Sequence, residues 1–245
     1  LREHIQKLLK PGYYDEFEYS LAMVIDLDKC IGCGACEVAC QAENNLPLVG
    51  KQGIQQGREM QWLRIEKYWQ GEYPDVKQRF IPMLCQHCDA APCETVCPVS
   101  ATYHNQDGLN AQVYNRCIGT RSCAVYCPYE VRYFNWKTPT WDPPLEQQLN
   151  PDVTVREQGV MEKCTFCIQR VRGAKDNAKD EDRRVTDGEI QPACVQSCPA
   201  KALSFGDRND PNSQVSKLAK SPRGYQALAE LNTQPSIIYL KRIED

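Results

Sequence analysis

Residues 30–40 read Cys30-Ile31-Gly32-Cys33-Gly34-Ala35-Cys36-Glu37-Val38-Ala39-Cys40, and residues 117–127 can be laid over them with no gap. The second stretch reads Cys117-Ile118-Gly119-Thr120-Arg121-Ser122-Cys123-Ala124-Val125-Tyr126-Cys127. Every cysteine coincides except one, because Thr120 stands where the first stretch has Cys33. The spacing C-x2-C-x2-C-x3-C is that of bacterial iron–sulfur proteins, in which the fourth cysteine ligates a different cluster from the first three. A hydroxyl in place of one thiolate predicts a cluster that lacks one iron.

The fifteen cysteines of this 245-residue chain fall into four groups with no cysteine left over. Group one is Cys30, Cys33, Cys36 and Cys40; group two is Cys85, Cys88, Cys93 and Cys97; group three is Cys117, Cys123 and Cys127; group four is Cys164, Cys167, Cys194 and Cys198. Three thiolates within seven residues can hold three corners of a cubane, with Gly32, Gly34 and Gly119 easing the turns. The fourth cysteine, expected at the start of a helix, faces a neighbouring cluster. The groups therefore work in pairs and predict three [4Fe–4S] clusters and one [3Fe–4S] cluster.

Disulfides and zinc are two competing uses for so many cysteines. Disulfide frameworks belong mainly to small secreted domains, and an odd cysteine count in iron-cluster spacing argues against one here. Tetrahedral zinc also uses CxxC pairs, but as two separated pairs and not as runs of four that end in Cys-Pro. A zinc-bound scaffold and a free soluble polyferredoxin stay as alternatives. The net charge of −3 argues against a nucleic-acid partner, and no stretch approaches the roughly 20 apolar residues of a membrane span.

Short strands surround the cysteine groups in the predicted secondary structure. Strands are expected at 21–26, 62–69, 79–84, 111–114, 131–134, 202–205 and 236–240, and a helix at 215–231. Residues 1–20 read as an N-terminal docking arm or a short helix packed on its own domain. The proline-rich stretch 141–159 reads as a long surface connection, and the charged stretch 172–184 as a solvated helix or excursion.

Two further phrases carry a family resemblance. They are Gln86-His87-Cys88-Asp89-Ala90-Ala91-Pro92-Cys93-Glu94 and Cys127-Pro128-Tyr129-Glu130-Val131-Arg132-Tyr133-Phe134-Asn135. With the four groups, they resemble the four-cluster electron-transfer subunits of complex iron–sulfur molybdoenzymes, such as dimethyl sulfoxide, polysulfide and nitrate reductases, over roughly residues 20 to 245. The phrase 117–121 looks closest to the iron–sulfur subunit of alternative complex III, a quinol-oxidising respiratory assembly. There the four-cluster unit is the C-terminal part of a longer polypeptide, which would account for a start at Leu1. Some nitrate-reductase relatives have Trp at the position of Thr120.

The resemblance implies a pairing of group one with group four and of group two with group three. The implied ligand sets are Cys30, Cys33, Cys36 and Cys198; Cys40, Cys164, Cys167 and Cys194; Cys85, Cys88, Cys93 and Cys127; and, for the three-iron cluster, Cys97, Cys117 and Cys123. The fold implied is α+β, with interleaved bacterial ferredoxin-like modules, long loops and an N-terminal arm. We expect a docking arm at 1–20, a first module at 21–57 plus 160–210, a second at 58–140, and a C-terminal helix and strand at 211–245.

The function implied is electron transfer from a membrane quinol site along a line of clusters in a respiratory complex. No nucleophile or substrate pocket is predicted, so the chain would have no catalytic site of its own. The expected partners are a membrane-embedded quinone-binding subunit, next to the group-three cluster, and other subunits such as a multihaem cytochrome c. The alternative is the same module in a molybdopterin oxidoreductase. The expected location is the periplasmic face of the membrane, where partner subunits hold the chain.

Several other side chains are candidates for tuning or docking. Lys29, Arg116 and Lys163 each precede the first cysteine of a group, and a cation there would raise a cluster's potential; a solvent-exposed side chain of little consequence is the competing interpretation. His87 and His104 are candidates for proton exchange or iron ligation, against ordinary hydrogen-bonded histidines. Aromatic residues around group three either dock a membrane partner or shield a cluster from water: Tyr126, Tyr129, Tyr133, Phe134 and Trp136.

Overall fold

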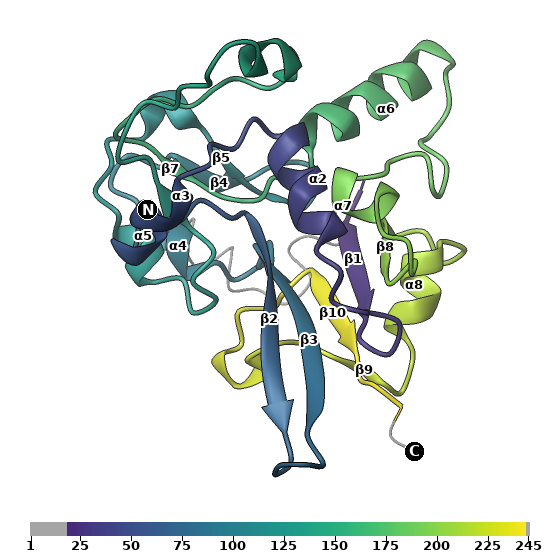
Figure 1. Cartoon of the computed structure of the whole chain (residues 1–245). Coiled ribbons are helices and arrows are strands. Elements are labelled where there is room, and N and C mark those ends of the chain that lie inside the picture. The colour runs from purple at the N-terminus through teal and green to yellow at the C-terminus, as the bar shows by residue number, and fades with distance from the viewer. Residues whose placement is uncertain (1–18, 244–245) are drawn as a thin grey trace.

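The computed structural model describes residues 19–243, so the predicted docking arm lies outside the described residues except for its last two positions. The fold is the α+β arrangement that the sequence predicts, built of short elements (Figure 1). The strands are β1 (Leu21–Asp26), β2 (Leu63–Gln70), β3 (Lys77–Leu84), β4 (Thr102–His104), β5 (Asn110–Gln112), β6 (Tyr133–Phe134), β7 (Met161–Glu162), β8 (Leu203–Asp207), β9 (Gly224–Tyr225) and β10 (Ile237–Leu240). The helices are α2 (Ala35–Glu43), α3 (Gly50–Gln55), α4 (Pro92–Thr95), α5 (Ser122–Val125), α6 (Ile168–Asp180), α7 (Ala193–Gln196) and α8 (Gln214–Ala219), with 3₁₀ turns η1 (Tyr114–Arg116), η2 (Leu145–Gln148) and η3 (Ala229–Leu231).

A four-stranded sheet in the order β8-β1-β10-β9 joins distant parts of the chain. All six residues of β1 are buried, because this central strand is covered on both faces and therefore reads as an almost continuous apolar run. Met23 pairs with Phe205 of antiparallel β8 and with Ile237 of parallel β10. On one face, Val215 of α8 packs against Ala22 and Val24, and the other face turns toward the main core. The sheet thus places the start of group one beside the end of group four.

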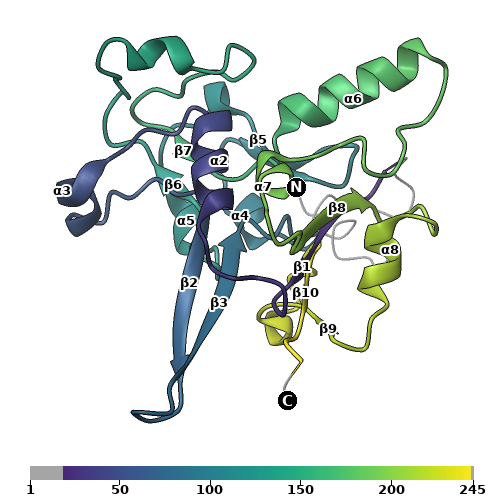
Figure 2. The same cartoon turned by 45° about the vertical axis from the view of Figure 1, so that its right-hand side comes forward.

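The longest strand pair, β2 and β3, is an antiparallel hairpin that extends away from the rest of the molecule (Figures 1 and 2). Its register runs from the Leu63–Leu84 pair at the base to the Gln70–Lys77 pair at the tip. The base is buried and the tip is exposed. The predicted strands at 62–69 and 79–84 are therefore confirmed. Since Leu84 directly precedes Cys85, this hairpin leads the chain into group two.

Two short antiparallel strand pairs flank the remaining cysteine groups. Strand β4 follows group two and pairs with β5, which leads toward group three. Strand β6 follows group three and pairs with β7, which ends one residue before Lys163 and group four. Of the solvated helix or excursion expected at 172–184, a helix is found as α6, which begins directly after Cys167, ends at Asp180, buries Val171, Ala174 and Ala178, and reaches outward (Figure 2). Each group is therefore bracketed by short strands or helices.

Two predictions about helices are wrong. The expected helix at 215–231 ends at Ala219, because Pro222 cannot continue the hydrogen-bonding pattern and Gly224 enters β9. The fourth cysteine of a group does not begin a helix. Instead the third cysteine is the second residue of each group's helix, as with Cys36 in α2 and Cys93 in α4, and the fourth lies within or just beyond it. The third thiol therefore sits where unpaired helical amides gather.

Candidate metal centres

All fifteen cysteines lie within the described residues and all carry free thiols. Most are buried, and only Cys33 is exposed. Their side chains form part of the main hydrophobic core together with residues such as Trp62 and Tyr239. The interior of this protein is therefore lined with thiols to an extent that an ordinary apolar core does not require.

Four thiols meet in the most deeply buried set. Burial, and then the charges of Cys164, Cys167 and Cys194, raise the pKa of Cys40 well above its usual range. The pKa of Cys194 is also raised strongly by burial and by Cys164 and Cys167. Four thiolates this close repel one another and lose hydration, so they need a cationic core to be stable. The residues present therefore fit a bound cluster.

The other three predicted sets are brought together in the same way. Burial and then Cys85, Cys93 and Cys127 raise the pKa of Cys88. Cys30 and Cys198 stand among the charges that act on Cys36, whose pKa burial first raises to about 12, and Cys33 acts on Cys30. Cys117 and Cys97 act in turn on Cys123. Thiols of each predicted set are therefore close enough for their charges to act on one another's pKa.

Some groups act on the pKa of a thiol in a different set, and these pairs indicate which sets are neighbours. Cys36 of the first set is among the groups that raise the pKa of Cys194, in the second set. Cys85 of the third set acts on Cys164 of the second. A single guanidinium, that of Arg132, acts on thiols of both the third and the fourth set. The predicted first set therefore lies near the second, the second near the third, and the third near the fourth.

Backbone amides are directed at the cysteine sulfurs. The Ala101 N–H lies 3.2 Å from Cys97 Sγ, and the Ala202 N–H lies 3.3 Å from Cys198 Sγ. Both amides come four residues after the last cysteine of a Cys-Pro group, so groups two and four share one local geometry. The Met161 amide donates likewise to Cys117 Sγ at 3.3 Å. Hydrogen bonds to sulfur favour the charged thiolate and influence the potential of any cluster it holds.

A small cavity is lined by the three thiols of the fourth set. Its walls include Cys97, Cys117 and Cys123, with Thr120 on the same wall. The Thr120 hydroxyl accepts from the Ser122 hydroxyl at 3.5 Å, and the Thr120 residue is exposed. The position at which this group lacks a cysteine therefore faces the surface of the protein.

Glycine is required at the turns directly before Cys33 in group one and before Thr120 in group three. Gly32 has φ +68° and Gly119 has φ +70°, in the left-handed region that glycine adopts without strain. A Cβ on Gly119 would lie 2.3 Å from the Gly159 carbonyl oxygen. The predicted role of these glycines in the cysteine turns is consistent with this geometry.

The spacing of the thiols bears on the choice between zinc and clusters. Among residues 19–243, no three His, Cys, Asp or Glu side chains converge closely enough to hold a single metal ion. Ligands of tetrahedral zinc would have to converge on one point. Ligands of a cubane need not, because each thiolate binds a different iron.

The three cations that precede cysteine groups differ in their surroundings. Lys29 and Arg116 are exposed. Lys163 is fully buried and donates to the Cys164 carbonyl at 2.8 Å and to the Asn110 carbonyl. The exposed-surface interpretation therefore holds for Lys29 and Arg116 and is wrong for Lys163.

Arg132 is a functional candidate that the sequence analysis did not single out. It is 6% exposed and donates to Cys93 Sγ at 3.0 Å. The signal was present in the sequence, since a cation stands between Val131 and Tyr133 in a short, mostly apolar segment that follows Cys127-Pro128. Only the fold, however, shows that this cation turns inward.

The two histidine candidates are both enclosed. His87 is fully buried, stacks on Phe166 with 4.0 Å between ring centroids, and has its pKa lowered well below normal by burial and then by Lys163. His104 lies 2.6 Å from Glu94. Of the group-three aromatic residues, Tyr129 and Tyr133 are buried, Phe134 is half-buried, and Tyr126 and Trp136 are exposed.

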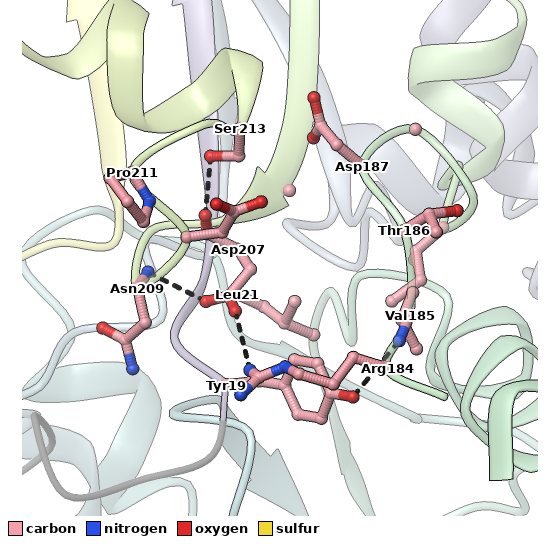
Figure 3. Close-up of a pocket in the computed structure, with 14 residues that line it drawn as sticks. Tyr19, Leu21, Arg184, Val185, Thr186, Asp187, Asp207, Asn209, Pro211 and Ser213 are labelled. Atoms are coloured by element: carbon pink, nitrogen blue, oxygen red, sulfur yellow. Dashed lines mark hydrogen bonds and ion pairs between the residues drawn. The ribbon is translucent and has the colours of Figure 1, made fainter. Parts of the chain in front are cut away.

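A pocket of about 760 Å³ lies apart from the cysteine groups, between segments 184–190 and 206–213 (Figure 3). No cysteine lines it. Asp207 accepts from the Asn209 amide at 2.9 Å and pairs with Arg184 at 3.5 Å across the pocket. The Arg184–Asp207 pair therefore joins the end of β8 to the loop before α7.

Models of the 4Fe-4S dicluster domain match this chain at residues 29–101 and at residues 76–143. The chain is 44% identical to the iron–sulfur cluster-binding subunit of menaquinone reductase from Nitratidesulfovibrio vulgaris, over 94% of this chain and 92% of that one. It belongs to the family of iron–sulfur subunits of the complex iron–sulfur molybdoenzyme type.

Other members of this family match along most of their length. The putative dimethyl sulfoxide reductase iron–sulfur protein of Halobacterium salinarum is 39% identical over 89% of this chain and 78% of its own. The arsenate respiratory reductase iron–sulfur subunit of Shewanella sp. ANA-3 is 36% identical over 90% of this chain and 96% of its own. The chain is thus an iron–sulfur electron-transfer subunit of a multi-subunit respiratory oxidoreductase complex that carries 4Fe–4S clusters. In the part of the chain that the structure describes, no helix has the length and apolar character to span a bilayer.

Proposed function

We propose that the four thiol sets hold four clusters in a line. Cys30, Cys33, Cys36 and Cys198 would hold the first; Cys40, Cys164, Cys167 and Cys194 the second; Cys85, Cys88, Cys93 and Cys127 the third; and Cys97, Cys117 and Cys123 the fourth. The observation that supports the proposal is that thiols within each proposed set act on one another's pKa, and that thiols or Arg132 link each set to the next. Bound clusters supply one-electron redox chemistry.

The fourth set is proposed to hold a [3Fe–4S] cluster. Its cavity is lined by three thiols and by Thr120, whose hydroxyl stays protonated near neutral pH and is a weak iron ligand. The Met161 and Ala101 amides donate to two of the three sulfurs. The missing thiol supports a cluster with one corner unfilled, which faces the surface, and the amides favour the charged form of the sulfurs that remain.

The chain is proposed to exchange electrons with menaquinone through a membrane-embedded partner at the fourth set. The support is the name of the menaquinone reductase relative, and the exposed apolar residues around this end: Ile118, Val125 and Tyr126 are 65%, 81% and 57% exposed. A second subunit would meet the opposite end of the line. The molybdoenzyme context is favoured over alternative complex III, because the putative dimethyl sulfoxide reductase and arsenate reductase subunits match nearly the whole chain.

Iron and acid-labile sulfide analysis of the purified complex, combined with low-temperature EPR, tests the cluster assignment. We expect a three-iron signal in the oxidised state and three distinct four-iron signals on stepwise reduction. A zinc content that matches the thiol sets, or an EPR spectrum with four four-iron clusters, would contradict it.

The quinone end is tested separately with an inhibitor of the quinone site. Potentiometric EPR with and without the inhibitor should show that only the three-iron signal is perturbed, because the fourth set lies at that end. A perturbation confined to a four-iron signal rejects this placement. Molybdenum and haem analysis of the same complex distinguishes a molybdopterin partner from a multihaem cytochrome c.

A further inference from the structure

Arg132 lies between two thiol sets and is held by four hydrogen bonds. Its guanidinium donates to Cys93 Sγ at 3.0 Å, Asn110 Oδ1 at 2.9 Å, Gln112 Oε1 at 3.0 Å and Thr102 Oγ1 at 3.1 Å. These partners come from α4, β4 and β5, so three elements fix the plane of the guanidinium. Arginine is suited to this task because its donors form a rigid planar fork.

The charge of Arg132 acts on thiols of two sets at once. Its positive charge lowers the pKa of both Cys93 and Cys123, although burial raises both pKa values overall. Cys93 belongs to the third set and Cys123 to the fourth. One buried cation is therefore shared by two neighbouring sites.

The contrast with Arg156 shows that Arg132 is not an ordinary buried ion pair. Arg156 is also buried, at 3% exposure, and lies 2.9 Å from the Glu162 carboxylate, which balances its charge. Among residues 19–243, the hydrogen bonds of Arg132 go to one sulfur and three neutral oxygens. The nearby Glu94 carboxylate accepts instead from Asn110 and lies 2.6 Å from His104. The charges that balance Arg132 are the cysteine sulfurs themselves.

We propose that Arg132 sets the reduction potentials of the third and fourth clusters together. The proposal rests on the ligand sets of the proposed function. A reduced cluster carries one more negative charge than its oxidised form. A cation in a low-dielectric interior favours that form far more than an exposed cation does, and a hydrogen bond to a ligand sulfur acts in the same direction. Because one charge serves both clusters, it raises both potentials and changes the difference between them little.

The test is potentiometric EPR on the purified complex with three variants. Arg132→Gln removes the charge and keeps a hydrogen-bonding amide, so the midpoint potentials of both clusters should fall. Arg132→Lys keeps the charge but loses the fork, so the potential of the Cys93 cluster should fall while that of its neighbour stays. The matched control is Arg116→Gln, which removes an exposed cation beside Cys117 and should shift neither potential, because solvent screens it.

Three results would overturn the proposal. They are unchanged potentials in Arg132→Gln with full iron content, a shift confined to one cluster in that variant, and an equal shift in Arg116→Gln. If Arg132→Gln does not retain its clusters, Arg132→Lys decides, and unchanged potentials of both clusters in that variant reject the proposal. The EPR spectrum of the wild-type complex distinguishes failure of this proposal from failure of the proposed function. If the wild type lacks separate signals for the third and fourth clusters, the ligand sets are rejected and not the role of Arg132.

Discussion

Segments 30–40 and 117–127 have nearly the same backbone and differ in one ligand. Gly34 and Arg121 both adopt left-handed φ values, +78° and +61°, directly before a helix. Ile31 and Ile118 are exposed to almost the same extent, 62% and 65%. The loop geometry is thus independent of whether the fourth residue is Cys33 or Thr120. We infer that the backbone builds a cradle for a cluster, and that one side chain decides how complete the cluster is.

The largest expected effect comes from removing a thiol at a buried position of a proposed cluster and not at an exposed one. Cys40→Ser removes a thiol from the fully buried second set, where no solvent can replace it. We expect loss of that cluster and at least about a tenfold fall in the yield of folded complex, a change of roughly 1.4 kcal/mol or more. Iron content per polypeptide and gel filtration measure this. A Cys40→Ser complex with normal yield and the wild-type four-iron signals would show that burial of the corner is unimportant.

The next prediction concerns the exchange of the residue types at positions 33 and 120. Thr120→Cys should add one iron per polypeptide and replace the three-iron EPR signal by a four-iron signal, because it restores the thiol that Cys33 provides in the other segment. Cys33→Thr should do the reverse at an exposed position that tolerates an open corner. Anaerobic iron analysis and EPR of both variants are the measurements. An unchanged three-iron signal in Thr120→Cys would mean that the cradles differ beyond this residue.

The shared turns should differ in their tolerance of a Cβ. At Gly119 a Cβ would meet the Gly159 backbone oxygen at 2.3 Å, whereas at Gly32 it would meet the Phe80 ring at 2.3 Å, and a side chain can move aside. We expect Gly119→Ala to cost about 3 kcal/mol and Gly32→Ala about 1–2 kcal/mol, including the strain of positive φ. Anaerobic thermal unfolding, at roughly 2–4 °C per kcal/mol, should rank them in that order, and equal shifts would reject this reasoning.

The smallest effect concerns the length of the helix that follows each turn. α2 has nine residues and α5 has four. Glu43 at the end of α2 pairs with Arg170 of α6 at 2.6 Å and accepts from Gln169 at 2.8 Å. Glu43→Gln should cost no more than about 1 kcal/mol, because the pair is partly exposed. A change in Tm above about 4 °C would show that this contact holds the two helices together more firmly than expected.

Local patterns in the sequence predict much of this molecule. The apolar run at 21–26 is the central strand, and the glycines beside the cysteines mark tight turns. The patterns fail where distant segments decide the outcome. The burial of Lys163 depends on Asn110, whose carbonyl accepts from its ammonium group. The inward turn of Arg132 depends on β4 and β5. Neither partner is adjacent in the chain, so no periodicity marks either cation.

The position of β10 has a consequence for how the protein is made. This strand lies in the interior of the sheet, parallel to β1 and next to it, and residue 237 is translated long after the cysteines of group one. Until β10 has been synthesised, β1 lacks this neighbouring strand. Its backbone groups on that side are unpaired, and the sulfurs of group one are uncovered. The proposed first and second clusters would therefore be enclosed only after residues up to 240 have been synthesised, because Cys194, Cys198 and β10 all come late in the chain.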